Sequence, residues 1–362
     1  MENNDNYQGV YYSEYLDLDK LLSAQHPESA KMGQTAHDEM LFIVIHQAYE
    51  LWFKQVLYEL ESIKKIFVGK LIDDHATDLQ IAIHRLRRIV KILELLVQQM
   101  AIMETMTPLD FLDFRDLLRP ASGFQSIQFK IIEAVLGLKM KHRHGYNYYL
   151  SQLKPKDKER IEAVEKQASV IEGVNGWLER MPFFDVPYFW KNYQNIYPQD
   201  SDNSIAHPFW RDYRQCYAQS LVSGEKKNLE LFDAVFLYEN EDITPHLSAA
   251  ACRAALFIML YRDFPLLHQP FQLLNSLLDI DEALADWRSK HINMVQRMIG
   301  ARVGTGGSTG SAYLKGALDA HYIFKEFSQL TTFLIERKHL PKLSKELTDE
   351  LSFFPQKKDI LD

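Results

Sequence analysis

The chain has 362 residues, 46% of them hydrophobic, and a formal net charge of −8 at pH 7. The acidic balance excludes the basic patch expected for binding to nucleic acid or to an anionic membrane surface, and no apolar stretch approaches the roughly 20 residues of a membrane span. Two widely separated cysteines, Cys216 and Cys252, exclude a disulfide scaffold and a cysteine zinc site. Because the N-terminus is polar and lacks a signal-peptide pattern, the sequence predicts a cytoplasmic protein.

Helical periodicity begins with residues 38–68. Apolar residues recur there at spacings of three and four, at Leu41, Ile45, Ala48, Trp52, Val56 and Leu60. Phe42, Tyr49 and Phe53 add a second apolar face, so we expect this helix to be buried at the centre of a bundle. The segment 77–105 has the same kind of pattern and predicts a second long helix.

The rest of the chain predicts more helices and no strands. The expected helices cover about 124–137, 157–180, 209–241, 246–262, a helix ending near 300, and 311–337. We expect the helix that ends near 300 to open at Asp279-Ile-Asp-Glu, with Asp279 or Asp281 as its N-cap. Residues 181–208, rich in proline and aromatic residues, predict an irregular connection or insertion. These patterns predict a single all-α domain over residues 1–362.

A glycine-rich stretch, MIGARVGTGGSTGSAY, occupies residues 298–313 and holds five of the fifteen glycines. It is not a phosphate loop, because no Gly-Lys-Ser/Thr follows at the required spacing. It also fails the dinucleotide pattern, since Thr309 stands where the third glycine is needed. The glycines therefore serve another purpose.

Two of the thirteen histidines, His46 and His291, stand on largely apolar helical faces. Phe42 and Tyr49 flank His46 at helical spacing, and Trp287 lies one turn before His291. Each histidine is either a buried side chain satisfied by a neighbour or part of a ligand set. Haem pockets are built between helices from aromatic and aliphatic walls and use histidine as an axial ligand.

Arg115 stands in an equally apolar setting, between Phe111, Phe114 and Leu118. The guanidinium either extends over apolar surface to water or binds a carboxylate with two parallel hydrogen bonds. The segment 120–123, Pro-Ala-Ser-Gly, breaks the helix with small residues, so another group can approach the backbone closely.

Together these segments resemble the tryptophan 2,3-dioxygenase family. They occur in the family's order and at comparable separations, and the likeness extends over most of the chain. The matching stretches are YYSEYLDLDKLL, HDEMLFIVIHQAYELWFKQ, FRDLLRPASGFQSIQF, PFQLLNSLLDID, WRSKHINMVQRMIGARVGTGGSTGSAYL and LIERKHLPK. The resemblance implies an all-α helical-bundle haem protein of the tryptophan and indoleamine dioxygenase type, which forms homotetramers in the cytosol.

The resemblance also implies a cofactor site for haem b. His291 would be the proximal ligand of the iron, with Trp287 packed nearby. Ser122 and Gly123 would belong to the cofactor-binding residues. Lys130 stands where many relatives have arginine, which leaves its contact with a haem propionate open.

The activity implied is cleavage of the indole C2–C3 bond of L-tryptophan by O2, giving N-formyl-L-kynurenine, the first step of tryptophan catabolism through kynurenine. His46 would be the distal catalytic residue, close to the indole N–H. Phe42 and Phe111 would wall the indole, and Arg115 would hold the substrate carboxylate. Thr305 would contact the amino-acid end, which makes the glycine-rich stretch a lid.

Tyr12 matches a tyrosine that a neighbouring subunit contributes to the pocket, so the resemblance ties activity to oligomerisation. Two other functions stay open at this point. A haem-dependent monooxygenase of the same superfamily, acting on tryptophan or a related aromatic amino acid, could keep the same ligands. A non-catalytic haem or tryptophan sensor is the other, although it would have less need of Arg115 and His46.

Overall fold

The computed structural model describes residues 9–69, 77–140, 143, 153–197, 207–238, 242–244, 246–300, 302, 304 and 321–352. In these residues the regular structure is helical and contains no strand, which confirms the all-α prediction. Three helices are much longer than the rest: α4 (Asp38–Gly69), α5 (Thr77–Met103) and α15 (His268–Ile299). The other α-helices are α1 (Tyr12–Tyr15), α2 (Leu18–Leu22), α3 (Glu28–Lys31), α6 (Pro108–Arg115), α7 (Ile127–Leu136), α9 (Pro155–Glu165), α10 (Val170–Glu179), α11 (Pro187–Trp190), α12 (Pro208–Ser220), α13 (Lys227–Phe236), α14 (Ala249–Leu260), α17 (Lys325–Gln329) and α18 (Lys345–Leu351).

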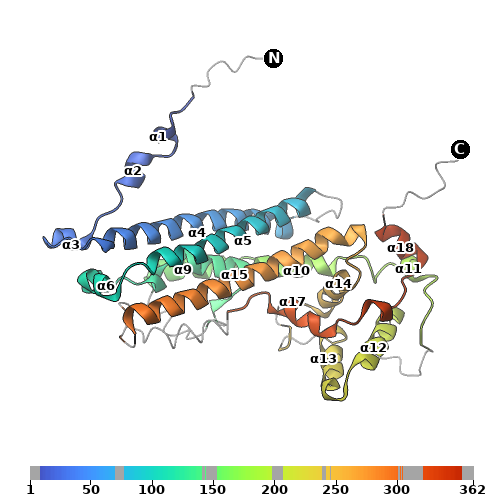
Figure 1. The fold of residues 1–362 in the computed structure, drawn as a ribbon. Coiled ribbons are helices and arrows are strands. Elements are labelled where there is room, and N and C mark those ends of the chain that lie inside the picture. The colour runs from blue at the N-terminus through green and yellow to red at the C-terminus, as the bar shows by residue number, and fades with distance from the viewer. Residues whose placement is uncertain are drawn as a thin grey trace, which may run out of the picture.

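The three long helices run side by side along the molecule (Figure 1). α5 packs against both α15 and α4, and α4 also packs against α7 and α10. Every third or fourth residue of α5, from Leu79 to Met103, is buried, so its apolar stripe faces the other two long helices. α12, α13 and α14 lie together at the end of the molecule away from α6, beside the C-terminal segment, residues 321–352 (Figure 1).

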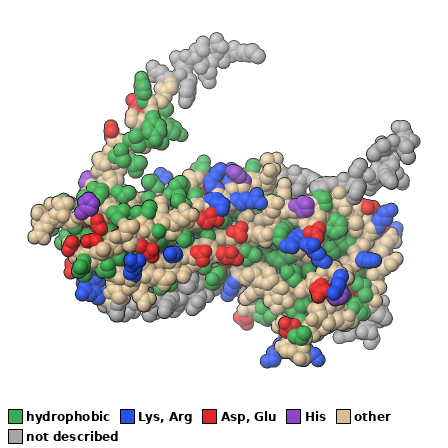
Figure 2. Space-filling model, in the orientation of Figure 1, with side chains coloured by type: hydrophobic (Ala, Val, Ile, Leu, Met, Phe, Trp, Pro, Cys, Tyr) green, Lys and Arg blue, Asp and Glu red, His purple; other side chains and the backbone are tan. Residues whose placement is uncertain are grey.

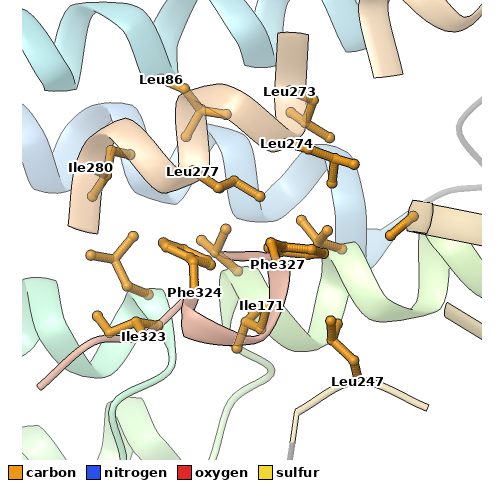
Figure 3. Close-up of a cluster of buried hydrophobic side chains, with 14 of the residues drawn as sticks. Leu86, Ile171, Leu247, Leu273, Leu274, Leu277, Ile280, Ile323, Phe324 and Phe327 are labelled. Atoms are coloured by element: carbon orange, nitrogen blue, oxygen red, sulfur yellow. The ribbon is translucent and has the colours of Figure 1, made fainter. Parts of the chain in front are cut away.

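A buried cluster joins α15 to the C-terminal segment. Leu277 and Ile280 of α15 lie opposite Phe324 and Phe327, with Ile171 of α10 beside them (Figure 3). All five side chains are at most 2% exposed. Full burial of a side chain of this size stabilises the fold by about 1.5–3 kcal/mol, so this cluster fixes the C-terminal segment against the long helix.

The prediction that a helix opens at Asp279 is wrong. α15 begins eleven residues earlier, at His268, and Asp279 and Asp281 lie inside it. Pro270 is tolerated because it falls in the first turn, where the missing N–H costs no helical hydrogen bond. Asp281 is buried and accepts hydrogen bonds from the backbone N–H groups of Ile323 (3.0 Å) and Phe324 (2.5 Å). Its carboxylate therefore caps a distant segment and not the start of its own helix.

Three other predicted helices are shorter or divided. The segment 157–180 forms α9 and α10, because Ser169 and Glu172 build a capping box that starts a new helix. The segment 209–241 forms α12 and α13. In the described part of 311–337, only α17 and two 3-10 turns, Leu330–Phe333 and the start of Arg337–His339, are helical. The backbone N–H groups of residues 323 and 324, immediately before α17, donate hydrogen bonds to the Asp281 carboxylate. These groups are therefore bound to a side chain of another helix at the point where α17 begins.

The N-terminal segment, residues 9–31, extends away from the helical body (Figure 1). Its side chains form an exposed apolar strip, visible in green in Figure 2. The most exposed are Tyr11 (77%), Tyr12 (75%), Tyr15 (76%) and Leu22 (72%). At its inner end the segment is attached to α4, because the Glu39 carboxylate accepts hydrogen bonds from the backbone N–H groups of Glu28 (2.8 Å) and Ser29 (3.0 Å).

No helix in the described ranges combines the length and the apolar character that crossing a membrane requires.

The predicted irregular connection is described by the structure at residues 181–197 and from residue 207 onward. It contains the four-residue helix α11 and buried aromatic rings. Phe183 and Trp190 are less than 10% exposed there. The ring centroids of Trp190 and Phe209, a residue of α12, lie 5.4 Å apart. This stretch therefore belongs to the core.

Candidate functional site

A cavity of about 320 Å³ lies between α4, α7 and α15, with α5 and α6 closing its sides. Its size is at the lower end of the range for small-molecule sites. Eight residues singled out from the sequence as site residues line it together: Phe42, His46, Phe111, Arg115, Ser122, Gly123, Trp287 and His291. His46 and His291 are 245 positions apart in the chain, and only the packing of α4 and α15 around one space brings them together.

His46 is held in a defined tautomer. Its Nδ1 lies 2.7 Å from the carbonyl oxygen of Phe42, one turn earlier in α4. A carbonyl can only accept, so Nδ1 carries the proton and Nε2 is left for the cavity. Burial lowers the pKa of His46 and outweighs the opposing effects of Phe42 and Glu50. The ring is therefore neutral at pH 7, with an acceptor nitrogen on a wall of the cavity.

His291 is also neutral and available. Burial, with a smaller effect from His46, lowers the pKa of His291 to about 4. The Trp287 ring stacks on it, with centroids 5.3 Å apart and planes 9° from parallel. Within the described part of the chain the imidazole makes no hydrogen bond. A neutral imidazole that lines a cavity in this way can donate a lone pair to a metal.

Aromatic rings form the wall next to His46. Phe42 lies 4.1 Å from the His46 ring and stacks on Phe111 at 5.7 Å. Phe114 meets both phenylalanines edge to face. Such a wall suits a flat aromatic ligand, because offset and edge-to-face ring contacts add to simple apolar burial.

Arg115 is the charged group beside this aromatic wall. It is the last residue of α6 and only 5% exposed, and it lines the cavity. Its guanidinium lies 4.0 Å from the carboxylate of Asp116, whose side chain is 78% exposed. A buried guanidinium at a cavity wall is suited to an anionic group of a ligand, since its planar fork matches a carboxylate.

A buried ionic cluster, which no sequence pattern indicated, forms another part of the wall. Glu133 of α7 pairs with Arg143 and with Arg288 of α15, the latter at 2.7 Å, and His321 Nδ1 lies 3.6 Å from the same carboxylate. Burial raises the pKa of Glu133, but the neighbouring cations outweigh it and hold the pKa well below the usual range. Arg143 belongs to a stretch rich in Lys and Arg, a composition typical of the protein surface. No regular spacing along the sequence connects Glu133, Arg143, Arg288 and His321.

Lys130, one turn before Glu133, also lines the cavity and is 7% exposed. Burial lowers the pKa of Lys130 to about 8, although Glu133 opposes the shift. Arg143 donates a hydrogen bond to the Lys130 backbone carbonyl at 3.1 Å. A lysine, two arginines and a glutamate therefore meet on one side of the cavity.

Ser122 and Gly123 reach the cavity from the turn between α6 and α7. The Ser122 hydroxyl caps this turn by accepting a hydrogen bond from Phe124 N at 3.3 Å.

Two other residues that the sequence predicted for the site are not among the described residues that line the cavity. Thr305 lies outside the described residues, although Gly304, immediately before it, lines the cavity. Tyr12 stands on the N-terminal segment and does not line this cavity.

Comparison with known proteins assigns this arrangement to a family. The family model described as tryptophan 2,3-dioxygenase matches residues 1–334. The chain belongs to the tryptophan 2,3-dioxygenase family. All the site residues named above fall inside the matched range, and so do the three long helices.

Individual members of the tryptophan 2,3-dioxygenase family match nearly the whole chain. The tryptophan 2,3-dioxygenase of Bdellovibrio bacteriovorus is 43% identical, over 96% of this chain and 99% of that protein. Those of Dictyostelium discoideum and Anopheles gambiae are each 42% identical, over 95% of this chain and 88% and 90% of their own lengths. These three relatives come from a bacterium, a slime mould and an insect, and each is matched over at least 88% of its own length.

Proposed function

We propose that this protein is a haem-dependent dioxygenase that cleaves the indole C2–C3 bond of L-tryptophan with O2 to give N-formyl-L-kynurenine. The observation that carries the proposal is the cavity itself. In a chain of this family, two neutral histidines from different helices line one aromatic pocket that also contains a buried arginine. Haem b would supply the activation of O2 that no protein side chain can provide.

His291 would ligate the haem iron. Burial keeps its imidazole neutral, which is the form that binds metal, and the stacked Trp287 ring holds its orientation. No group of three or more His, Cys, Asp or Glu in the described ranges could hold a metal ion. A single histidine in an apolar cavity fits an iron whose other ligands come from a macrocycle.

The ionic side of the cavity would hold the acidic side arms of the haem. Lys130 and Arg143 present cationic groups there, and Glu133 keeps Arg143 and Arg288 in place. Ser122 and Gly123 add a hydroxyl and an open backbone at the neighbouring turn. Carboxylates bind well to such a combination of cations and small hydrogen-bonding groups.

The aromatic side would bind the substrate. Phe42 and Phe111 offer flat surfaces to the indole ring and exclude water from it. Arg115 would bind the α-carboxylate and so select an amino acid over a simple indole. Thr305 stays a prediction for the amino-acid end, supported by the position of Gly304 at the cavity.

His46 would orient the indole. With its proton on Nδ1 and bound to the Phe42 carbonyl, the ring offers Nε2 to accept a hydrogen bond from the indole N–H. This contact fixes which edge of the indole faces the cofactor, a positioning effect. Burial lowers the pKa of His46 and so weakens it as a base, and we therefore assign it an orienting role and not proton removal.

We also propose that the protein is a cytoplasmic homotetramer. The exposed apolar strip of the N-terminal segment is what a contact with a second copy would bury. Tyr12 on that strip would then reach the cavity of a neighbouring subunit. The two free, buried cysteines suit a reducing compartment.

Turnover under isotopically labelled oxygen tests the activity. Purified protein with haem, ascorbate and L-tryptophan in 18O2 should give N-formylkynurenine that carries two 18O atoms. A product with one 18O atom would replace the proposal with a monooxygenase. Tryptophan binding without any product would replace it with a sensor.

A further inference from the structure

Methionines are concentrated around the cavity. The chain has eleven methionines, and five of them line this one space. They are Met100, Met103, Met106, Met294 and Met298. Met294 and Met298 follow His291 by three and seven residues, so they share its face of α15. Met100 and Met103 lie on the facing part of α5, and Met106 follows that helix.

These five side chains are protected from bulk solvent. Met100, Met103, Met106 and Met298 are each at most 8% exposed, and Met294 is partly buried. Leucine would fill the same volume with better-defined rotamers. What methionine adds is a soft thioether, which can be oxidised at sulfur.

Other methionines of the chain provide internal references. Met32 and Met40 are 69% and 44% exposed and do not line the cavity. Met140 and Met181 are each 6% exposed and are buried elsewhere. An oxidant in bulk solvent reacts fastest with the methionines that are most exposed. It should therefore oxidise Met32 and Met40 first, and it should oxidise the cavity methionines and the other buried methionines to similar extents.

We propose that the five cavity methionines are a modification site, at which peroxide formed inside the cavity is consumed by oxidation of the thioethers. The inference rests on the proposed haem-dependent function. Hydrogen peroxide would form there when O2 takes up two electrons and two protons without reaching the substrate, with both electrons supplied in net by an external reductant such as ascorbate. The peroxide O–O bond then breaks. One oxygen bonds to sulfur, which loses two electrons, and the other leaves as water.

The modification would also regulate the site. A sulfoxide places a polar S=O group in a wall that is apolar before oxidation. Binding of an apolar ring there then weakens, because the sulfoxide must be desolvated. Methionine sulfoxide is chemically a reversible product, because dedicated enzymes reduce it back to methionine. The lining would protect Trp287 and Tyr49 nearby, whose oxidation has no such repair.

Site-resolved mass spectrometry of the wild-type protein tests the proposal. The haem-loaded protein, verified by its Soret band, is kept in air with ascorbate and with catalase to remove peroxide from bulk solution. The apoprotein is treated with a limiting amount of hydrogen peroxide without catalase. Sulfoxide is then quantified at each methionine by peptide mapping.

The expected order of oxidation reverses between the two samples. In the haem-loaded protein, cavity methionines should carry at least ~3-fold more sulfoxide than Met32 and Met40, and Met140 and Met181 should stay unmodified. In the apoprotein, Met32 and Met40 should be oxidised first. Equal or greater oxidation of Met32 and Met40 in the loaded protein would overturn the inference alone. Absence of a Soret band would overturn the proposed function as well.

Discussion

At the scale of single residues, the chemistry of the cavity depends on which atoms are left without a local partner. The Phe42 carbonyl occupies His46 Nδ1 and so directs Nε2 to the cavity. Burial, with a smaller effect from His46, lowers the pKa of His291 and keeps its ring neutral. The sequence predicted both histidines from their apolar helical faces, but it left open whether each was structural. That choice needed the hydrogen bonds and the cavity.

Replacing His291 tests its role as the iron ligand. The His291→Ala protein should fold but lose the Soret band of the haem-loaded protein, because alanine has no lone pair for the iron. Absorption spectra after haem titration measure this, and added imidazole should restore part of the band. A full Soret band in the variant without imidazole would contradict the assignment.

Replacing Arg115 tests the carboxylate contact. Arg115→Lys should raise the KM for L-tryptophan about 10-fold or more, because a charged hydrogen bond contributes about 1.5–3 kcal/mol and lysine cannot form the bidentate pair. Steady-state kinetics measure this, with the Soret band unchanged.

Arg119→Lys is the matched control, since Arg119 is exposed and does not line the cavity. Tryptamine, which lacks the carboxylate, should be a poor substrate of the wild type and should lose little further in Arg115→Lys. Equal losses for both substrates would show that Arg115 acts on the fold and not on the carboxylate.

At the scale of elements, the site depends on how α7 and α15 are held together. Glu133 of α7 reaches Arg288 of α15, and Asp281 of the same helix holds residues 323 and 324. Sequence periodicity predicted α4, α5 and α7 closely. It misplaced the start of α15, because an acidic pair inside a helix resembles an N-cap when its distant partners are unknown.

The end of α7 offers a test of this packing. Gly137 has φ of 139°, and a Cβ there would lie 2.3 Å from Ile171 Cγ2 of α10. Gly137→Ala should therefore destabilise the protein by about 1–3 kcal/mol through backbone strain and overpacking. The midpoint of denaturant unfolding measures the change.

Gly224→Ala is the control for that substitution. A Cβ at Gly224 meets nothing within 4 Å, and its φ lies outside the left-handed region. Its midpoint should stay close to that of the wild type. If Gly137→Ala were equally neutral, the close approach of α7 and α10 would not be a constraint on the fold.

At the scale of the whole molecule, the N-terminal segment exposes apolar side chains that no other part of the described chain covers. Its most exposed side chains are Tyr11, Tyr12, Tyr15 and Leu22, while Glu39 fixes its inner end to α4. Exposed apolar surface of this kind gains stability when a partner removes it from water. This segment therefore carries the proposed assembly.

Removing residues 1–24 tests that role. The truncated protein should keep the helical circular dichroism of the body, since the contacts of Glu39 with residues 28 and 29 remain. Light scattering should show a mass below that of the tetramer, and tryptophan turnover should fall with it. Removal of residues 353–362 is the control at the other end of the chain. An intact, active tetramer after N-terminal truncation would contradict the proposal.

The sequence by itself determined the helical class, the long helices, the candidate histidines and the resemblance to the family. It could do so because helical periodicity is local and because the motifs are long. Only the tertiary structure decided that α15 begins at His268, that Glu133 meets Arg143 and Arg288, and that His46 and His291 line one cavity. These are contacts between residues far apart in the chain, set by how long helices pack, and no spacing along the sequence records them.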